Sequence, residues 1–132
     1  MSDSEQRGPG LRVVVVDDDP LVLAVTRRVL TRLGYVVAVF DDARQALSDV
    51  AHTKPFAVVA DLHMPDMDGS ELLALVAELS PQTWRLLYTG EGQASELARA
   101  LVPGLTHAVV PKADGVRLLP EALARGRATD VR

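Results

Sequence analysis

The sequence contains no cysteine and few aromatic residues. Without cysteine the chain has no disulfide framework, no thiol nucleophile and no cysteine-ligated zinc site. Aromatic residues make up 4% of the 132 residues, so a hydrophobic core must be built mainly from valine, leucine and alanine. No apolar run approaches the roughly 20 residues that a membrane-spanning helix requires. The sequence therefore predicts a protein without a membrane segment.

An excess of basic residues is also missing. Eighteen acidic residues stand against fourteen basic ones, which gives a formal net charge of −4. A protein that binds nucleic acid directly needs a basic face to neutralise phosphates, so we expect no direct nucleic-acid partner. Hydrophobic residues make up 48% of the chain and charged residues 24%, as in an ordinary folded domain.

Short apolar segments alternate with helical patterns along the chain. Residues 11–16 are a valine-rich run without polar alternation, which is typical of a strand buried on both faces. Pro20 then stands where a helix can begin, and apolar residues recur at helical spacing until Gly34. The predicted strands are residues 11–16, 35–40, 56–60, 84–89 and 105–110, and the predicted helices lie within 20–33, 43–50, 72–79, 94–101 and 118–123.

Five strands that alternate with five helices indicate an α/β fold. We expect a single doubly wound (βα)5 domain, with a parallel sheet of five strands and helices on both of its faces. The domain is predicted to span residues 11–126, with a disordered leader at 1–10 and a tail or linker stub at 127–132. The leader has no apolar stretch of the kind found in signal peptides, so a cytoplasmic location is expected.

Polar residues follow the predicted strands. Asp17 and Asp18 come after the first strand and Asp61 after the third, while Thr89 ends the fourth and Lys112 follows the fifth. In an open parallel sheet the carboxyl ends of the strands share one edge, and ligands bind there. We therefore expect three carboxylates, one hydroxyl and one ammonium to converge.

Other polar residues have simpler explanations. Aspartates that precede predicted helices are expected to be N-caps, namely Asp19, Asp41 and Asp42. Turn formation before Gly69 explains the aspartates of the preceding loop, Asp66 and Asp68. The histidines have neither the spacing nor the partner residues of a zinc site, and they are His52, His63 and His107.

Crowded carboxylates repel each other unless a cation compensates their charge. Oxygen ligands without histidine or cysteine favour a hard ion, and Mg²⁺ fits them better than Zn²⁺. Neither a Walker-type loop nor a Gly-x-Gly-x-x-Gly turn is present, so nucleotide is not the expected ligand. The residues predict a metal-assisted phosphoryl site in which a carboxylate can serve as the nucleophile.

At this point the sequence resembles a known family. The valine run that ends in Asp-Asp-Asp-Pro, the segment Asp-Leu-His-Met-Pro-Asp-Met-Asp-Gly at 61–69, Tyr-Thr-Gly at 88–90 and Pro-Lys at 111–112 are similar to those of response-regulator receiver domains of two-component signalling. The resemblance covers about residues 11–126. It implies a chemotaxis-regulator-like fold with the flavodoxin-like strand order 2-1-3-4-5.

The resemblance also implies a role for each residue of the edge. Asp61 would accept the phosphoryl group, and Thr89 and Lys112 would bind its oxygens. Mg²⁺ would be held by carboxylates and one backbone carbonyl, from Asp17, Asp18, Asp61 and His63. The implied partners are a histidine kinase or phosphotransfer protein and a downstream protein target, with a phosphorylation-dependent homodimer as a further assembly. Such a receiver is not classed as an enzyme, although it takes part in phosphoryl transfer to its own aspartate and in the later loss of that group.

Two departures from the family pattern keep other hypotheses open. Val109 stands where receivers commonly carry an aromatic residue, and Ala113 follows Lys112 where proline is usual. A receiver-like interaction module that is not phosphorylated is therefore an alternative. A more remote alternative is a haloacid-dehalogenase-like phosphatase, whose paired acids would be Asp17 and Asp19. Leu21 stands two residues past Asp19, where these phosphatases have threonine or valine. The short chain also leaves no room for the cap domain of such phosphatases.

Overall fold

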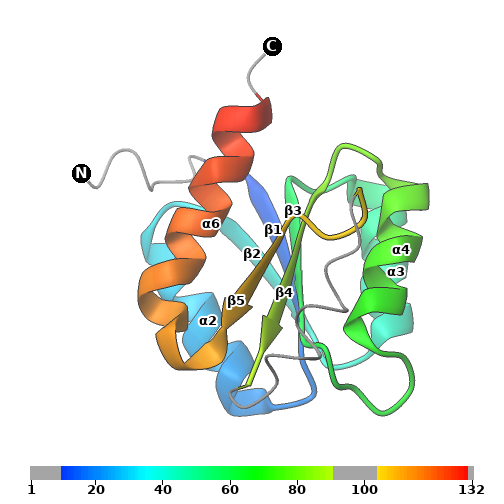
Figure 1. Cartoon of the computed structure of the whole chain (residues 1–132), viewed down its shortest axis with the longest axis horizontal. Coiled ribbons are helices and arrows are strands. Elements are labelled where there is room, and N and C mark those ends of the chain that lie inside the picture. The colour runs from blue at the N-terminus through cyan, green and yellow to red at the C-terminus, as the bar shows by residue number, and fades with distance from the viewer. Residues whose placement is uncertain (1–9, 91–103, 131–132) are drawn as a thin grey trace.

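A computed structural model describes residues 10–90 and 104–130 of the chain (Figure 1). Five parallel strands form one sheet in the order β2-β1-β3-β4-β5, which confirms the predicted fold class and strand order. The strands are β1 (Arg12–Val16), β2 (Val36–Phe40), β3 (Ala57–Ala60), β4 (Trp84–Thr89) and β5 (Ala108–Pro111).

Helices cover both faces of this sheet. On one face lie α2 (Pro20–Arg32) and α6 (Gly115–Asp130), and on the other lie α3 (Ala43–Thr53) and α4 (Gly69–Leu79) (Figure 1). A short 3-10 turn, η1 (Lys112–Asp114), joins β5 to α6. The predicted helix at 94–101 and most of the predicted leader lie outside the described residues. Helix α6 continues beyond residue 126, and the predicted domain boundary there stays a prediction.

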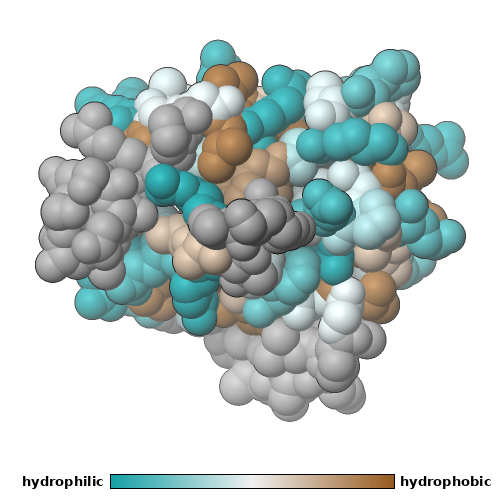
Figure 2. Space-filling model, turned by 90° about the horizontal axis from the view of Figure 1, so that it is seen from above, coloured by the Kyte–Doolittle hydropathy of each residue, from teal (hydrophilic) through white to brown (hydrophobic). Residues whose placement is uncertain are grey.

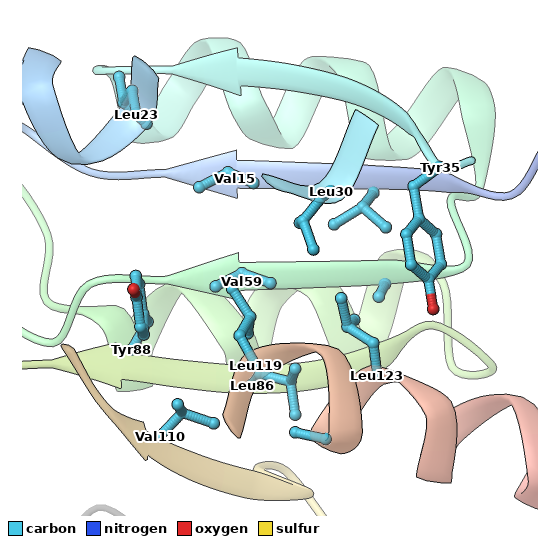
Figure 3. Packing of buried hydrophobic residues seen from close by; sticks show 13 residues of the cluster. Val15, Leu23, Leu30, Tyr35, Val59, Leu86, Tyr88, Val110, Leu119 and Leu123 are labelled. Atoms are coloured by element: carbon cyan, nitrogen blue, oxygen red, sulfur yellow. The ribbon is translucent and has the colours of Figure 1, made fainter. Parts of the chain in front are cut away.

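The valine run of β1 fills both hydrophobic cores, as its pattern predicts. Alternate residues of a strand point to opposite faces of a sheet. Val13 and Val15 therefore pack with α2 and α6 in the first cluster, part of which Figure 3 shows. Val14 and Val16 pack with α3 and α4 in the second cluster. All four are buried, so the continuous apolar run reflects a central strand of the sheet.

Aspartate N-caps begin three of the helices. The side chain of Asp19 accepts a hydrogen bond from the backbone N–H of Leu21 at the start of α2, and Asp42 caps α3 in the same way. Asp68 caps α4, where the sequence predicted a turn residue. The predicted cap at Asp41 is wrong, because Asp42 makes these bonds. Each cap satisfies backbone donors that the first turn of a helix leaves unpaired.

Among the strands, the largest departure from the prediction is at β5, which begins at Ala108 and not at residue 105. The buried guanidinium of Arg85 accounts for the shorter strand. It donates hydrogen bonds to the backbone carbonyl oxygens of Gly104 and Leu105 at 2.8 Å each. These carbonyls are bound by a side chain and not by the neighbouring strand. The ladder between β4 and β5 therefore pairs residues only from Leu86 and Ala108 onward.

The other differences at strand ends are of one residue: β1, β2 and β3 begin one residue later than predicted, and β5 ends one residue later. None of the helices in the described part of the chain is both long enough and apolar enough to cross a membrane.

Candidate functional site

The carboxyl ends of β1 and β3 place two aspartates side by side. The backbone N–H of Asp17 donates to the carbonyl of Phe40 at 3.1 Å, and that of Asp61 donates to the carbonyl of Val16 at 2.9 Å. Both residues therefore continue the backbone ladder by one position beyond their strands. The parallel register brings their side chains to the same edge of the sheet, as the sequence predicted.

Asp17 is the most deeply buried acid of this edge, with 1% of its surface exposed. Its Oδ1 atom accepts a hydrogen bond from the backbone N–H of Asp19 at 2.9 Å. Its Oδ2 atom is fully buried and has no hydrogen-bond partner within the described part of the chain. It does contact the Lys112 ammonium as an ion pair. This oxygen faces the interior of the site.

Lys112 is the cation of the site. Its Nζ atom lies 2.8 Å from Oδ2 of Asp17 and 3.5 Å from Oδ2 of Asp61. Burial disfavours the charged ammonium, but the contacts with the two carboxylates outweigh that effect, and the pKa of Lys112 is raised above its usual value. Lysine is therefore charged at neutral pH and partly compensates the repulsion between the acids.

The carboxyl group of Asp61 is held in a less favourable environment for its charge. Its pKa is raised, first by burial and then by the negative charge of Asp17, while Lys112 and the backbone N–H of His63 act in the opposite direction. The N–H of His63 donates to Oδ1 of Asp61 at 3.4 Å, which is a long hydrogen bond. The ammonium of Lys112 thus does not fully compensate the negative charges of the carboxylates at this edge.

Asp18 completes a group of three acids. One oxygen from each of Asp17, Asp18 and Asp61 lies within 4.8 Å of the other two, and this is the one group of potential metal ligands in the parts of the chain that the structure describes. Asp18 itself is exposed, so the group opens to solvent on its side. Oxygen donors at this spacing can hold a hard divalent ion.

Thr89 and His63 also lie at this edge. Thr89 is fully buried at the end of β4, and in the register of the sheet it faces Pro111, the residue before Lys112. His63 is exposed in the loop after β3, next to the carboxylate that its backbone contacts. Val109 is partly buried on β5, where it packs against the cluster of α3 and α4.

Sequence reasoning missed the role of Gly69. It attributed this glycine to a turn, but Gly69 is buried and begins α4 against the back of Asp61. A Cβ atom there would overlap the backbone carbonyl oxygen of Asp61 and come within 2.8 Å of the side chain of Leu87. The sequence signal for this role is the pair Asp68-Gly69. Glycine is needed there because α4 packs closely behind the candidate site.

A separate groove lies at the opposite edge of the sheet. It has a volume of about 650 Å³, and the residues that line it include Arg12, Lys54, Phe56 and Leu79. Figure 2 views the molecule from this side and shows apolar atoms between hydrophilic ones. The groove is far along the strands from the acidic group and takes no part in it.

The comparison with protein families agrees with this geometry. The family model described as "Response regulator receiver domain" matches residues 13–123. The chain belongs to this family. The acidic group and Lys112 thus lie at the edge of a receiver domain, and a receiver domain of a response regulator is generally not classed as an enzyme.

Several relatives share this receiver domain. The response regulator MprA of Mycolicibacterium vanbaalenii is 36% identical over 118 residues, which cover 89% of this chain and 49% of MprA. The two-component response regulator ORR23 of Oryza sativa subsp. indica is 37% identical over 101 residues, which cover 74% of this chain and 14% of that protein. The chain spans at most about half the length of either relative.

Solved structures have the same fold. The signal receiver domain of an HD domain-containing protein from Pseudomonas fluorescens Pf-5 superimposes with a TM-score of 0.82 at 28% identity, covering 91% of this chain and 96% of that one. The BeF3-activated DrrB receiver domain gives a TM-score of 0.79 at 25% identity, covering 90% and 98%.

Proposed function

We propose that this receiver accepts a phosphoryl group on Asp61, with Mg²⁺, from the phosphohistidine of a histidine kinase or phosphotransfer protein. The signal then passes to a downstream protein by contact. The observation that carries this proposal is the meeting of three carboxylates and the Lys112 ammonium at one edge of the sheet. Membership of the receiver family implies a histidine kinase as the general partner.

The acidic group fits a magnesium ion. Its donors are hard carboxylate oxygens, and the buried Oδ2 atom of Asp17 has an ion pair with Lys112 but no hydrogen bond in the described residues. The ion would be held by the side chains of Asp17, Asp18 and Asp61 and by the backbone carbonyl of His63. When bound, Mg²⁺ supplies positive charge that stabilises the oxygens of the phosphoryl group in transfer.

Asp61 is the carboxylate best suited to act as the nucleophile. The contacts of Asp17 with the N–H of Asp19 and with Lys112 are short, at 2.9 and 2.8 Å. The corresponding contacts of Asp61 with the N–H of His63 and with Lys112 are longer, at 3.4 and 3.5 Å. Burial and the charge of Asp17 raise the pKa of Asp61, so its charged form is less well stabilised than that of an ordinary aspartate.

The transfer forms one bond and breaks another. An oxygen of Asp61 attacks the phosphorus atom, the new O–P bond forms an acyl phosphate, and the P–N bond to the kinase histidine breaks. The imidazole leaves with the electron pair of that bond and takes up a proton. Lys112 neutralises charge on the transferred oxygens, and the hydroxyl of Thr89 donates a hydrogen bond to one of them. Later attack by water on phosphorus returns the Asp61 carboxylate and releases inorganic phosphate.

The test is incubation with acetyl phosphate and Mg²⁺, followed by intact-mass measurement. We expect the chain to gain one phosphoryl group, and Asp61→Asn to gain none. Asp19→Asn is the matched control, because asparagine keeps the helix cap and Asp19 lies outside the acidic group. A gain that persists in Asp61→Asn contradicts the proposal.

Further outcomes favour one of the two alternatives. A gain that persists in Asp61→Asn and disappears in Asp17→Asn favours the phosphatase alternative, whose nucleophile would be Asp17. No gain in the unaltered chain, with either acetyl phosphate or phosphoramidate, favours the receiver-like interaction module.

A further inference from the structure

Tyr88 lies beside the candidate site but on the other face of the sheet from its threonine neighbour. It is the residue before Thr89 on β4, and its side chain packs into the cluster formed by α2 and α6. Figure 3 shows it at the end of that cluster opposite Tyr35. Only 8% of its surface is exposed. The ring is therefore held between the sheet and the two helices.

The hydroxyl of Tyr88 lies next to α2. The side chain of Thr26, a buried residue in the middle of that helix, is close enough to lower the pKa of Tyr88. Lys112 and Asp17 are close enough to influence its pKa in opposite directions, although burial is the larger effect and raises it. The hydroxyl thus has a fixed place near the site without being part of it.

Gly115 rests directly on this tyrosine. A Cβ atom at Gly115 would overlap the hydroxyl oxygen of Tyr88 and would come within 2.6 Å of Cζ and 2.7 Å of Cε1. The backbone of Gly115 has φ −58° and ψ −39°, which any residue adopts in a helix. Glycine is therefore required here because of the ring beneath it and not because of its own conformation.

Gly115 is joined to Lys112 by a single turn. The backbone N–H of Gly115 donates to the carbonyl oxygen of Lys112 and closes the 3-10 turn between β5 and α6. Two residues separate them in the chain, so a shift of Gly115 moves the backbone of Lys112. The lysine must reach 2.8 Å from Asp17 and 3.5 Å from Asp61 across this edge.

We propose that Tyr88 is a positioning residue for Lys112: its ring, packed between the sheet and the helices α2 and α6, supports Gly115 and so sets how far the lysine reaches into the acidic group. This role rests on the proposed function, because the reach of Lys112 matters for phosphoryl transfer only if Asp61 is the acceptor. The contacts themselves belong to the unmodified protein and can be tested without phosphorylation.

The direct test follows the Lys112 side chain by NMR. The sequence has two lysines, Lys54 and Lys112, so their Cε–Hε signals are told apart by a Lys54→Arg variant. In the metal-free protein we expect Gly115→Ala to move the Lys112 signal toward the position of a free lysine. Adding Tyr88→Leu makes room for the new methyl group, and we expect the double variant to return the signal toward its original position.

Gly126→Ala is the matched control. This glycine lies on the same helix, and a Cβ there would come within 2.5 Å of the indole ring of Trp84. The substitution also crowds an aromatic ring packed against α6, but toward the far end of the helix from Lys112. An equal shift of the Lys112 signal in Gly126→Ala overturns the proposal, as does an unchanged signal in Gly115→Ala. If Gly115→Ala does not fold, Tyr88→Leu alone must move the signal, and an unchanged signal there also overturns it.

A kinetic measurement completes the test. With acetyl phosphate we expect Gly115→Ala to lose on the order of tenfold or more in the rate of phosphorylation, since small misplacements of a catalytic group are costly. Its Mg²⁺ affinity should stay within about twofold, because the ligands are carboxylates and a carbonyl. Failure of the unaltered chain to be phosphorylated contradicts the proposed function alone, because the lysine signals still report the position of Lys112. A rate unchanged in Gly115→Ala overturns the positioning role.

Discussion

Lys112 is paired more closely with Asp17 than with the proposed phosphoacceptor, at 2.8 Å from Oδ2 of Asp17 and 3.5 Å from Oδ2 of Asp61. The same ammonium therefore compensates the most buried carboxylate of the edge before any phosphoryl group arrives. Phosphorylation would add close to two negative charges at Asp61 and draw the lysine toward them. The proposed transfer thus includes an exchange of the partner of Lys112.

Removal of this ammonium should destabilise the metal-free protein. We expect Lys112→Met to lower the free energy of unfolding by about 2 kcal/mol, because it leaves the buried charge of Asp17 without its cation. The loss should be smaller than for a fully buried ion pair, because Lys112 is partly exposed. Urea unfolding at neutral pH measures it. Lys54→Met is the control, since Lys54 is exposed and donates a hydrogen bond to the carbonyl of Leu79, and it should change the free energy by less than about 0.5 kcal/mol. Equal losses in both variants would contradict the expectation.

Removal of the charge of Asp61 should have the opposite effect. The pKa of Asp61 is raised in the folded protein above the usual 3.8, so its ionised form weakens the fold. We expect Asp61→Asn to gain on the order of 1 kcal/mol at neutral pH without metal. Below pH 3.8 the carboxyl is protonated in both states, and the gain should vanish as the pH falls through the raised pKa. Thermal melts of both proteins from pH 7 to pH 3.5 test this, and a loss of stability in Asp61→Asn at pH 7 would show that its charge is satisfied.

His107 should make the fold sensitive to mild acid. Its Nδ1 atom accepts a hydrogen bond from the backbone N–H of Arg85 at 2.9 Å, and its ring stacks on Trp84. Burial and then the charge of Arg85 lower the pKa of His107 below the usual 6.5. The neutral ring therefore contributes its full stabilisation above pH 6.5. This stabilisation is lost as the pH falls through the lowered pKa of His107 in the folded protein.

His107→Asn tests this dependence, because the amide oxygen of asparagine can accept the same bond and does not titrate. Urea unfolding at pH 7.5 and pH 5 should show a smaller loss on acidification in the variant than in the unaltered chain. Equal losses would exclude His107 as the source of the acid sensitivity.

The two tyrosines should respond oppositely to loss of the hydroxyl. The Tyr35 hydroxyl is buried without a hydrogen-bond partner in the described residues, so Tyr35→Phe should raise the free energy of unfolding by about 1 kcal/mol. Tyr88→Phe should lower it, because the Tyr88 hydroxyl has the Thr26 side chain beside it as a polar partner. The pair serves as its own control in denaturant titrations. A loss in Tyr35→Phe would mean that its hydroxyl has a partner.

The sequence alone determined the alternation of strands and helices and the residues that end each strand. The valine run of β1 predicts a central strand, since a strand covered on both faces has no position for a polar side chain. The convergence of Asp17, Asp61 and Lys112 follows from the same reasoning, because parallel strands bring their carboxyl ends to one edge. These inferences need only the period of a strand and the direction of the chain.

Only the tertiary structure decided how these groups pair. Lys112 reaches Asp17 more closely than Asp61, and this difference of less than an ångström depends on where the turn after β5 rests. The start of β5 depends on the guanidinium of Arg85, which binds carbonyls about 20 residues away along the chain. Gly115 is required by the ring of Tyr88, which no local pattern reveals. Contacts between distant segments are set by the packing of whole elements, so spacing along the sequence cannot predict them.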